Sequence, residues 1–313
     1  MKTDLEDRTT SEPAHSTCPE YILGHTRAEL DRLIFQGKFY ERQTRLHLVE
    51  AGLLPGMRVL DFGCGVGDVA FLAAALVGEA GQVVGIDRSE EAVQTARARA
   101  AAMGLRHVEL RRVDDLELTS HFSSGSFDAV IGRLVLMYQP DPSACLRRLS
   151  TVLRPGGFAM FHEVQMAMGW HGAHPPSSTL TKLWGWMSAA CARAGVELQM
   201  GLKLRQAFLD AGFAAPELLL TSWVSGGSES PAYEYLAETI RSLLPAIVKF
   251  GIATAEEVEI ETLAARLRAE IVAGNGAIVP SMLVGGIGRW PGLPEGPSCS
   301  PQKIRASCSA QKF

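Results

Sequence analysis

Residues 59–68 have the sequence VLDFGCGVGD. Its first residues are apolar and partly β-branched, which is typical of a buried strand, and Gly63, Gly65 and Gly67 follow at once. The apolar segment 68–77 then has the pattern of a helix. Glycines let a backbone turn tightly and approach a ligand, and the first N–H groups of a helix are free to bind a carboxylate or phosphate. The stretch therefore predicts a strand, a tight turn and a helix that together hold a ligand.

Strands and helices are predicted to alternate through the first half of the chain. Short apolar runs predict five strands, at residues 57–61, 82–87, 107–111, 127–131 and 158–163. Helices are expected at residues 68–77, from an N-cap at Ser89 to Gly104, and at 142–153. This alternation predicts an α/β fold, a doubly wound and mostly parallel sheet with helices on both faces. Such sheets bind ligands at the carboxyl ends of their strands.

The rhythm changes after Glu163. Helices are predicted near residues 179–194 and 202–211, a strand near 217–224, and helices starting at Ser230 and at Thr254, where T-x-x-E forms a capping-box pattern. Pro245 is expected to kink or end the first of these last two helices. Residues 276–289 predict a last strand, placed at an edge or bulged because Pro280 and several glycines interrupt it.

The domain prediction follows from composition. Residues 1–19 and 291–313 are polar or rich in Pro, Gly and Ser, and are expected to be disordered. Residues 20–290 are expected to form one domain, in which 20–50 make an N-terminal helical cover and 165–275 include the helical cover of a substrate site.

The glycine turn is compatible with two classes of cofactor. A dinucleotide site has the pattern G-x-G-x-x-G, whereas Asp68 stands where the third glycine would be, and Asp61 precedes the turn. A carboxylate at this place repels a pyrophosphate but suits an ammonium group. These acids therefore disfavour a nicotinamide-dependent oxidoreductase, which remains as an alternative.

Three groups would match the parts of S-adenosylmethionine (SAM), which carries an ammonium, a ribose and an adenine. Asp61 flanks the turn, and Asp87 ends the second strand, where a carboxylate can accept hydrogen bonds from both ribose hydroxyls. After the third strand, the side chains and amides of Asp114, Asp115 and Leu116 could bind the amino edge of adenine.

Together these motifs resemble those of the class I SAM-dependent methyltransferases, over roughly residues 20–165. The matching motifs are D-x-G-C-G-x-G from Asp61, V-G-I-D ending at Asp87, F-D-A-V-I from Phe127 and L-R-P-G-G from Leu153. The opening from Tyr21 and the second half resemble the ubiquinone and menaquinone methyltransferase-like branch, which acts on small molecules. This resemblance implies a Rossmann-like sheet of seven strands.

The resemblance also implies site residues. It places Gly132, Arg133 and Leu134 beside the methionine part of SAM, and Tyr21 and Gln36 in a helical cover over it. The full set of expected cofactor residues is Tyr21, Gln36, Asp61, Gly63, Cys64, Gly65, Gly67, Asp87, Arg88, Asp114, Asp115, Leu116, Gly132, Arg133 and Leu134. Within this set Cys64 is also explained as a small packing residue.

Candidate catalytic residues stand at the end of the fifth strand. Methyl transfer requires mainly that the acceptor atom be held near the methyl group, but a hydroxyl acceptor benefits from a general base. His162 and Glu163 are the candidates, with a structural role as the alternative for both. His171 and His174 form H-x-x-H, but no third ligand follows at convincing spacing, so no metal is expected.

Composition limits the remaining partners. The formal charge is −4, from 30 basic and 34 acidic residues, and no basic cluster is interleaved with aromatics, so nucleic acid is disfavoured. No signal peptide or membrane-spanning run is found, and six scattered cysteines suit reduced thiols, so a cytoplasmic protein is expected.

The expected activity is methyl transfer to a small, apolar or aromatic acceptor by a monomer or homodimer. A SAM-binding protein without turnover is a further alternative. Trp170, Trp184, Trp186, Trp223, Tyr233 and Tyr235 could line the acceptor pocket or simply pack.

Overall fold

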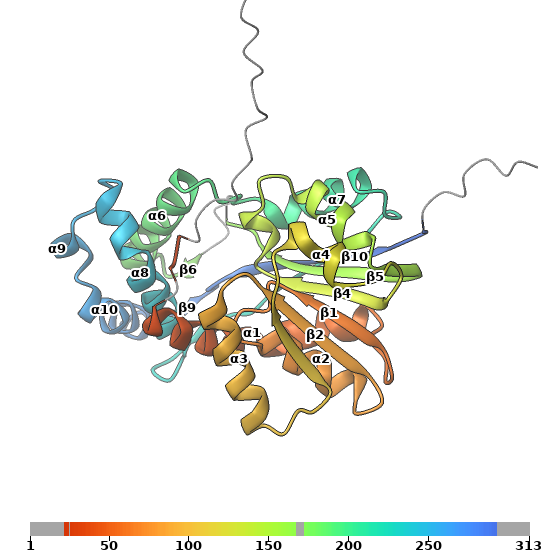
Figure 1. The fold of residues 1–313 in the computed structure, drawn as a ribbon. Coiled ribbons are helices and arrows are strands. Elements are labelled where there is room, and N and C mark those ends of the chain that lie inside the picture. Colours follow the sequence, from red (N-terminus) through yellow and green to blue (C-terminus); the bar gives the residue numbers. More distant parts are fainter. Residues whose placement is uncertain (1–21, 25, 167–171, 293–313) are drawn as a thin grey trace, which may run out of the picture.

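The computed structural model describes residues 22–24, 26–166 and 172–292 (Figure 1). The segments 1–19 and 293–313, for which disorder is expected, lie outside these residues, as do Tyr21, Trp170 and His171. The remaining predictions can be compared with the structure element by element.

The core is a seven-stranded sheet in the order β3-β2-β1-β4-β5-β10-β7. Its first five strands are parallel, and β10 runs antiparallel to both of its neighbours. The strands are β1 (Arg58–Phe62), β2 (Gln82–Asp87), β3 (Val108–Arg112), β4 (Phe127–Arg133), β5 (Leu153–Val164), β7 (Glu217–Ser222) and β10 (Met282–Arg289). The predicted mostly parallel sheet of seven strands is therefore confirmed.

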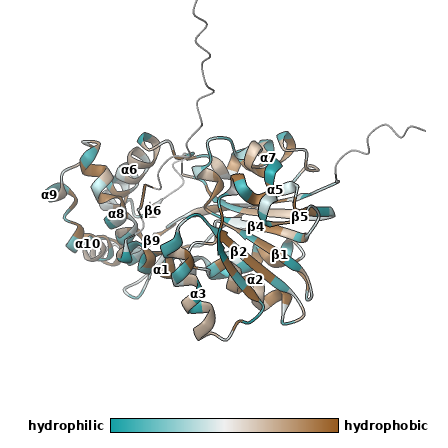
Figure 2. Cartoon of the chain, in the orientation of Figure 1, coloured by the Kyte–Doolittle hydropathy of each residue, from teal (hydrophilic) through white to brown (hydrophobic). Residues whose placement is uncertain are grey.

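Helices cover both faces of this sheet (Figure 1). On one side lie α1 (Arg27–Glu50), α2 (Asp68–Val77) and α3 (Glu90–Ala102), and on the other lie α5 (Pro142–Ser150) and α7 (Met200–Asp210). Ser89 caps α3 as expected, since its hydroxyl accepts a hydrogen bond from the Ala92 amide. Figure 2 shows the apolar residues concentrated in the strands and on the helix sides that face them. Burial of this apolar surface is the main force that holds the layers together.

A second group of helices lies beside the sheet (Figure 1). It contains α6 (Ser178–Arg193), α8 (Ala232–Lys249), α9 (Ala255–Val258) and α10 (Ile260–Ala273), with a small sheet of β6 (Ala173–His174), β9 (Ala277–Ile278) and β8 (Ser225–Gly226). Helix α8 packs against α6, α10 and α1. Three short helices, η1 (Asp115–Glu117), α4 (Leu118–His121) and η2 (Leu136–Tyr138), connect the strands of the core. The second group is the helical part expected within residues 165–275.

The prediction of one last strand at residues 276–289 is wrong. This segment forms two strands in different sheets, β9 and β10, with Pro280 between them. Strand β10 lies inside the sheet, between β5 and β7, and the edge strand is β7. The glycines of β10 make room for helices on both faces: Gly285 faces His47 of α1, and Gly286 faces Leu204 of α7.

Three smaller expectations also differ from the structure. Helix α8 continues through Pro245 to Lys249, so this proline does not end it. The helix expected from Thr254 has the predicted capping box but is divided into α9 and α10 at Glu259, whose φ of 47° is left-handed. Strand β5 begins at Leu153, and its pairing with β4 shifts register between Phe127 and Ala129, so the Arg154–Gly157 turn lies within the strand.

Substituting Gly285 with alanine tests the close packing of α1 on the sheet. A Cβ at this position would lie 2.0 Å from the His47 ring, so α1 or β10 must shift. We expect a loss of about 2–3 kcal/mol in the free energy of unfolding, measured with denaturant. The matched control is Gly185→Ala in α6, where a Cβ meets nothing within 4 Å and alanine is the better helix former. Equal stability of the two variants would contradict the packing described.

Candidate active site

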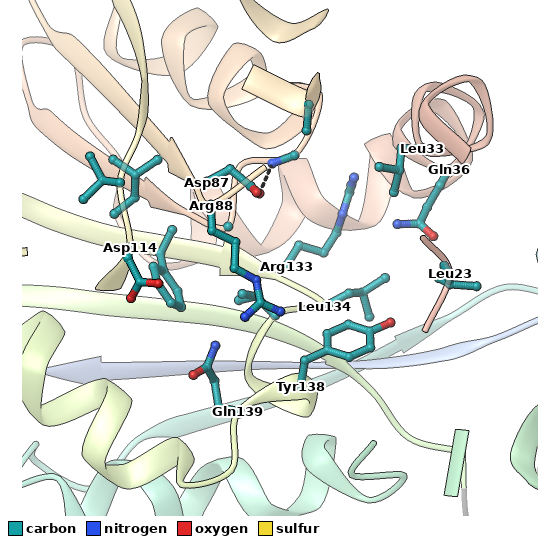
Figure 3. A pocket seen from close by; sticks show the side chains of 17 residues that line it. Leu23, Leu33, Gln36, Asp87, Arg88, Asp114, Arg133, Leu134, Tyr138 and Gln139 are labelled. Carbon is teal, nitrogen blue, oxygen red and sulfur yellow. Dashed lines mark hydrogen bonds between the residues drawn. The ribbon is translucent and has the colours of Figure 1, made fainter. Parts of the chain in front are cut away.

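Two adjoining cavities open at the carboxyl ends of the parallel strands. The first encloses about 1000 Å³ of empty space, including its mouth, and is bounded by the ends of β1, β2 and β4. The predicted residues that line it are Gln36, Gly63, Gly65, Asp87, Arg88, Asp114, Arg133 and Leu134 (Figure 3). Side chains from separate loops thus meet in one place, as expected for a site at the carboxyl edge of a parallel sheet.

Asp87 is the best-placed acidic side chain of the first cavity. One carboxylate oxygen accepts a hydrogen bond from the amide of Gly65 at 2.9 Å (Figure 3), and the other accepts one from the amide of Ser89 at 2.9 Å. A carboxylate has about four acceptor positions, so each oxygen can accept a further hydrogen bond. Asp87 can therefore bind a diol while it fixes the glycine turn.

The glycine turn needs glycine for two different reasons. Gly63, Gly65 and Gly67 all have left-handed φ values, of 67°, 50° and 92°. A side chain at Gly63 would also collide with Val135, whose Cγ2 lies 2.5 Å from the Cβ position. Gly67 is the N-cap of α2 and packs against Phe71 rather than lining the cavity. The turn leaves the backbone of Gly63 and Gly65 exposed to a ligand.

The second cavity encloses about 560 Å³ and adjoins the first. Leu23, Gln36, Leu134 and Tyr138 line both cavities, so one ligand in each would meet at these four residues. The rest of its wall comes mainly from apolar and aromatic side chains of α6, α8 and the end of β5. A pocket of this kind suits an apolar small molecule.

The first half of the chain matches a known family. Residues 53–191 match a family model described as a methyltransferase domain. This matched segment is similar in sequence to the SAM-dependent methyltransferases, and the fold of the chain is similar to that of a solved methyltransferase-like structure. The matched residues run from β1 into α6 and include the glycine turn and most of the wall of the first cavity, whereas Leu23, Leu33 and Gln36 of that wall lie outside the match.

Three comparisons indicate which members of the family are similar. The 2-phytyl-1,4-naphtoquinone methyltransferase of Synechococcus elongatus is 45% identical over 34% of this chain and 45% of the relative. The aklanonic acid methyltransferase of a Streptomyces species is 39% identical over 40% and 56%. A crystal structure described as a candidate methyltransferase from Bacillus halodurans aligns over 80% of this chain and 99% of its own, with a TM-score of 0.53 and 17% identity. The chain spans only about half the length of these curated relatives, and the solved structure supports the fold alone.

Asp61 of the methyltransferase motif lies behind the cavity wall. It is 1% exposed, and neither carboxylate oxygen makes a hydrogen bond of regular geometry within the described residues. Burial raises the pKa of Asp61 to about 8, although the charge of Arg133 and the amide of Ala70 oppose this shift. In the ligand-free chain Asp61 is therefore mostly protonated at neutral pH.

The other predicted cofactor residues that the structure describes do not line the first cavity. Cys64 is buried against Gly85, and Gly132 gives space to Phe161, whose ring would lie 2.6 Å from a Cβ. The side chain of Leu116 is 71% exposed, and its amide donates to the Asp114 carboxylate at 3.0 Å. Tyr21 and the side chain of Asp115 lie outside the described residues.

Leu134 lies between the two cavities because of its backbone conformation. Its φ of 55° is left-handed, which is uncommon for a residue other than glycine. This conformation follows β4 directly and places the side chain in the walls of both cavities. The neighbouring Arg133 donates a hydrogen bond to Thr44 of α1 at 3.0 Å, which ties the end of β4 to the helical cover.

His162 and Glu163 line neither cavity and are fully buried. The Glu163 carboxylate accepts hydrogen bonds from the amides of Val135, Leu136 and Met137, at 3.0, 2.8 and 3.3 Å. His162 packs on His47, with ring centroids 4.1 Å apart, and burial holds its pKa well below the usual value. These contacts favour a structural role for both residues, in which Glu163 fixes the loop that follows β4.

Of the aromatic residues considered for an acceptor pocket, some line the second cavity and others pack within the protein. Trp184 and Tyr235 line the second cavity. Trp223 packs edge-on against Phe39, and the Tyr233 hydroxyl donates to the carbonyl of Gly227. Three further lining residues are not predicted from the sequence: Arg32 and Tyr40 of α1, and Tyr138 of η2. Helical spacing alone does not show which side of α1 faces a cavity, and no local pattern marks the short helix η2 as part of a site.

The described part of the chain contains neither a candidate metal site nor a candidate membrane-spanning helix. There, no group of three His, Cys, Asp or Glu side chains could hold a metal ion, and His171 of the H-x-x-H pattern is not included. Within the same residues, no helix combines the length and the hydropathy that crossing a bilayer requires.

Proposed function

We propose that the chain binds SAM in the first cavity and transfers its methyl group to a small, mainly apolar acceptor in the second. The observation that carries this proposal is the shared wall of Leu23, Gln36, Leu134 and Tyr138. Two ligands that meet there would be held in contact without a gap for bulk water. Holding two reactants together in this way provides most of what a methyl transfer needs.

The residues of the first cavity fit each part of SAM. Asp87 would accept hydrogen bonds from the ribose hydroxyls, and Asp114 lies where the adenine edge is expected. The exposed backbone of Gly63 and Gly65 and the guanidinium of Arg133 suit the carboxylate of the methionine part. When bound, SAM supplies a methyl group on a positively charged sulfur, which is attacked in line by the acceptor.

The chain itself would position the acceptor and exclude water. Leu23, Gln36, Leu134 and Tyr138, which line both cavities, would hold the acceptor atom against the methyl group that a bound SAM would supply. The mainly apolar wall of the second cavity keeps water from competing for the methyl group. Among the described residues, neither cavity wall contains a histidine, so proton removal by an imidazole is not part of the proposal.

Transfer of a labelled methyl group tests this function directly. The full chain is incubated with methyl-labelled SAM and a panel of apolar phenols, enols, thiols and amines, and the organic extract is counted. We expect label in the extract for at least one acceptor class and S-adenosylhomocysteine (SAH) in equal amount. Tight binding of SAH with no transfer to any acceptor would instead favour a SAM-binding protein without turnover.

A thermal shift separates methyltransferase from oxidoreductase. A ligand present at 100 times its Kd stabilises the folded state by about 2.7 kcal/mol, which raises Tm by several degrees. We expect this rise with SAH and none with NADH, because Asp68 and Asp61 occupy positions that disfavour a pyrophosphate. A shift with NADH alone would reverse the assignment.

The proposal extends to the partners and the location of the protein. We infer a small-molecule acceptor rather than a nucleic acid, since the net charge is −4 and the second cavity is mainly apolar. Cys64, Cys145 and Cys191 are buried cysteines outside any disulfide, which supports a reducing, cytoplasmic location. A monomer or homodimer is compatible with this function.

A further inference from the structure

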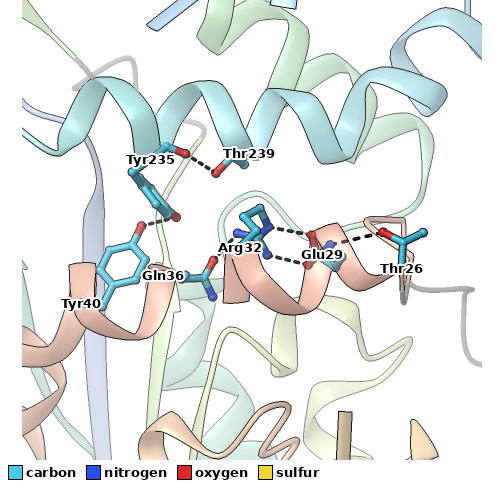
Figure 4. A network of polar contacts seen from close by, with 7 residues as sticks. All are labelled: Thr26, Glu29, Arg32, Gln36, Tyr40, Tyr235 and Thr239. Atoms are coloured by element: carbon cyan, nitrogen blue, oxygen red, sulfur yellow. Dashed lines mark hydrogen bonds and ion pairs between the residues drawn. The ribbon is translucent and has the colours of Figure 1, made fainter. Parts of the chain in front are cut away.

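One wall of the second cavity carries a buried network of polar side chains on two successive turns of α1 (Figure 4). Arg32 forms a two-pronged ion pair with Glu29, in which Nε and Nη2 each donate to one carboxylate oxygen at 2.7 Å. Its Nη1 donates to the Oε1 atom of Gln36 at 2.8 Å. Glu29 and Arg32 are 1% and 3% exposed. Such a planar, doubly bonded guanidinium has little freedom to turn.

The arginine fixes the orientation of the Gln36 amide. A guanidinium has only donors, so the atom of Gln36 that faces it must be the oxygen. The amide nitrogen therefore points away from Arg32, and Figure 3 shows it on the side toward the cavity. Gln36 lines both cavities, so this N–H donor lies at the place where the two ligands would meet.

The charges of this wall are arranged asymmetrically. Arg32 lines the second cavity, whereas Glu29, which balances its charge, does not. No described residue in that wall is Asp, Glu, His or Lys. Burial also raises the pKa of Tyr40, Tyr235 and Cys191, so their phenols and thiol stay uncharged at neutral pH. A positive ligand would thus meet a cation and no carboxylate.

We infer that the second cavity selects an apolar acceptor whose polar group is a hydrogen-bond-accepting oxygen, rather than an amine. Gln36 binds this oxygen through its amide nitrogen, next to the cofactor, and Glu29 and Arg32 act as positioning residues that keep the amide in this orientation. Because the ion pair is internally neutralised, the acceptor needs no full charge. The inference rests on the proposed methyl transfer and adds the class of its acceptor.

Three probes with one carbon skeleton test this selectivity: 2-acetylnaphthalene, 2-ethylnaphthalene and 1-(2-naphthyl)ethylamine. They present a carbonyl, a methylene and, at pH 7.5, an ammonium at the same position. Each is titrated into the full chain, with and without SAH, and binding is followed by fluorescence. We expect the ketone to bind at least tenfold more tightly than the amine, since an ammonium buried without a partner is strongly disfavoured.

Two variants test whether the preference for the ketone comes from the polar network of Glu29, Arg32 and Gln36. Gln36→Met keeps the side-chain length but removes the donor, and should weaken binding of the ketone about threefold to tenfold while binding of the hydrocarbon stays within twofold. The double variant Glu29→Gln/Arg32→Gln removes the buried ion pair as a unit, which avoids leaving one charge alone, and should cause the same ketone-specific loss. The matched control is Arg27→Gln/Asp31→Asn, an exposed ion pair on the same helix, which should change nothing.

The acceptor class and the proposed methyl transfer can fail independently in these experiments. Equal or tighter binding of the amine, an equal loss for ketone and hydrocarbon in Gln36→Met, or no binding of any probe would overturn the acceptor class. Absence of SAH binding would instead overturn the proposed function, and the titrations without SAH would still report the selectivity of the cavity.

Discussion

Substituting Asp87 with alanine is expected to weaken binding of SAH by at least about 100-fold, measured by isothermal titration. A hydrogen bond to a charged group contributes about 1.5–3 kcal/mol, and the proposed ribose would lose two of them. The amides of Gly65 and Ser89 would also lose their acceptor, which loosens the turn that approaches the ligand. No other described residue of the cavity wall replaces both functions.

A graded series makes this result specific. Asp87→Asn keeps one acceptor oxygen and should lose less affinity than alanine, about tenfold. Asp31→Ala removes an exposed carboxylate from α1, outside both cavity walls, and should bind like the unaltered chain. Unchanged affinity in Asp87→Ala, with an unchanged Tm, would mean that the ligand does not occupy the end of β2.

A pH dependence of stability is expected from Asp61. Its pKa rises from the usual 3.8 to about 8 because the folded chain buries it. Between these values the folded state holds a proton that the unfolded state has released, so stability falls as pH rises. The slope is on the order of 1.4 kcal/mol for each pH unit while this difference persists. Denaturant unfolding of the ligand-free chain from pH 4.5 to 8.5 measures it.

Asp61→Asn should flatten this profile, because the amide has no proton to lose. Below about pH 7 two other buried groups act in opposite directions: burial raises the pKa of Glu163 from 4.5 to about 7, which lowers stability as pH rises, and burial lowers the pKa of His162, which raises stability as pH rises. The clearest loss of slope in Asp61→Asn is therefore expected between about pH 7 and 8. Asp128, Glu197 and Glu270, whose pKa values are lowered, act only at more acidic pH. A profile that is identical in the two proteins would show that Asp61 is ionised in the folded state.

The sequence predicted the cofactor half of the molecule well because local signals there agree with one another. The strand, turn and helix of residues 58–77 lie within one or two residues of their predicted positions, and Asp87 ends β2 as expected. Each position depends on backbone requirements that act over a few residues, such as left-handed glycines and helix caps. Such requirements can be recognised without knowing the rest of the fold.

The errors arose where a partner distant in sequence decides the outcome. The glycines of β10 looked like interruptions of an edge strand, but they are the contacts for His47 and Leu204, from helices that no local pattern links to it. The role of Glu163 also depends on distant contacts: its place at the end of β5 makes it a candidate base, and three amides from the loop after β4 that bind its carboxylate favour the structural alternative. The second cavity was only partly predicted, since α1, α6 and α8 meet there from three separate regions.

Isothermal titration of the full, unaltered chain with SAH, with NADH titrated in parallel, shows which cofactor the first cavity binds. We predict micromolar binding of one SAH per chain and no heat from NADH. Binding of NADH with no binding of SAH would contradict the assignment of the first cavity to SAM, and with it the proposed transfer of a methyl group to the second.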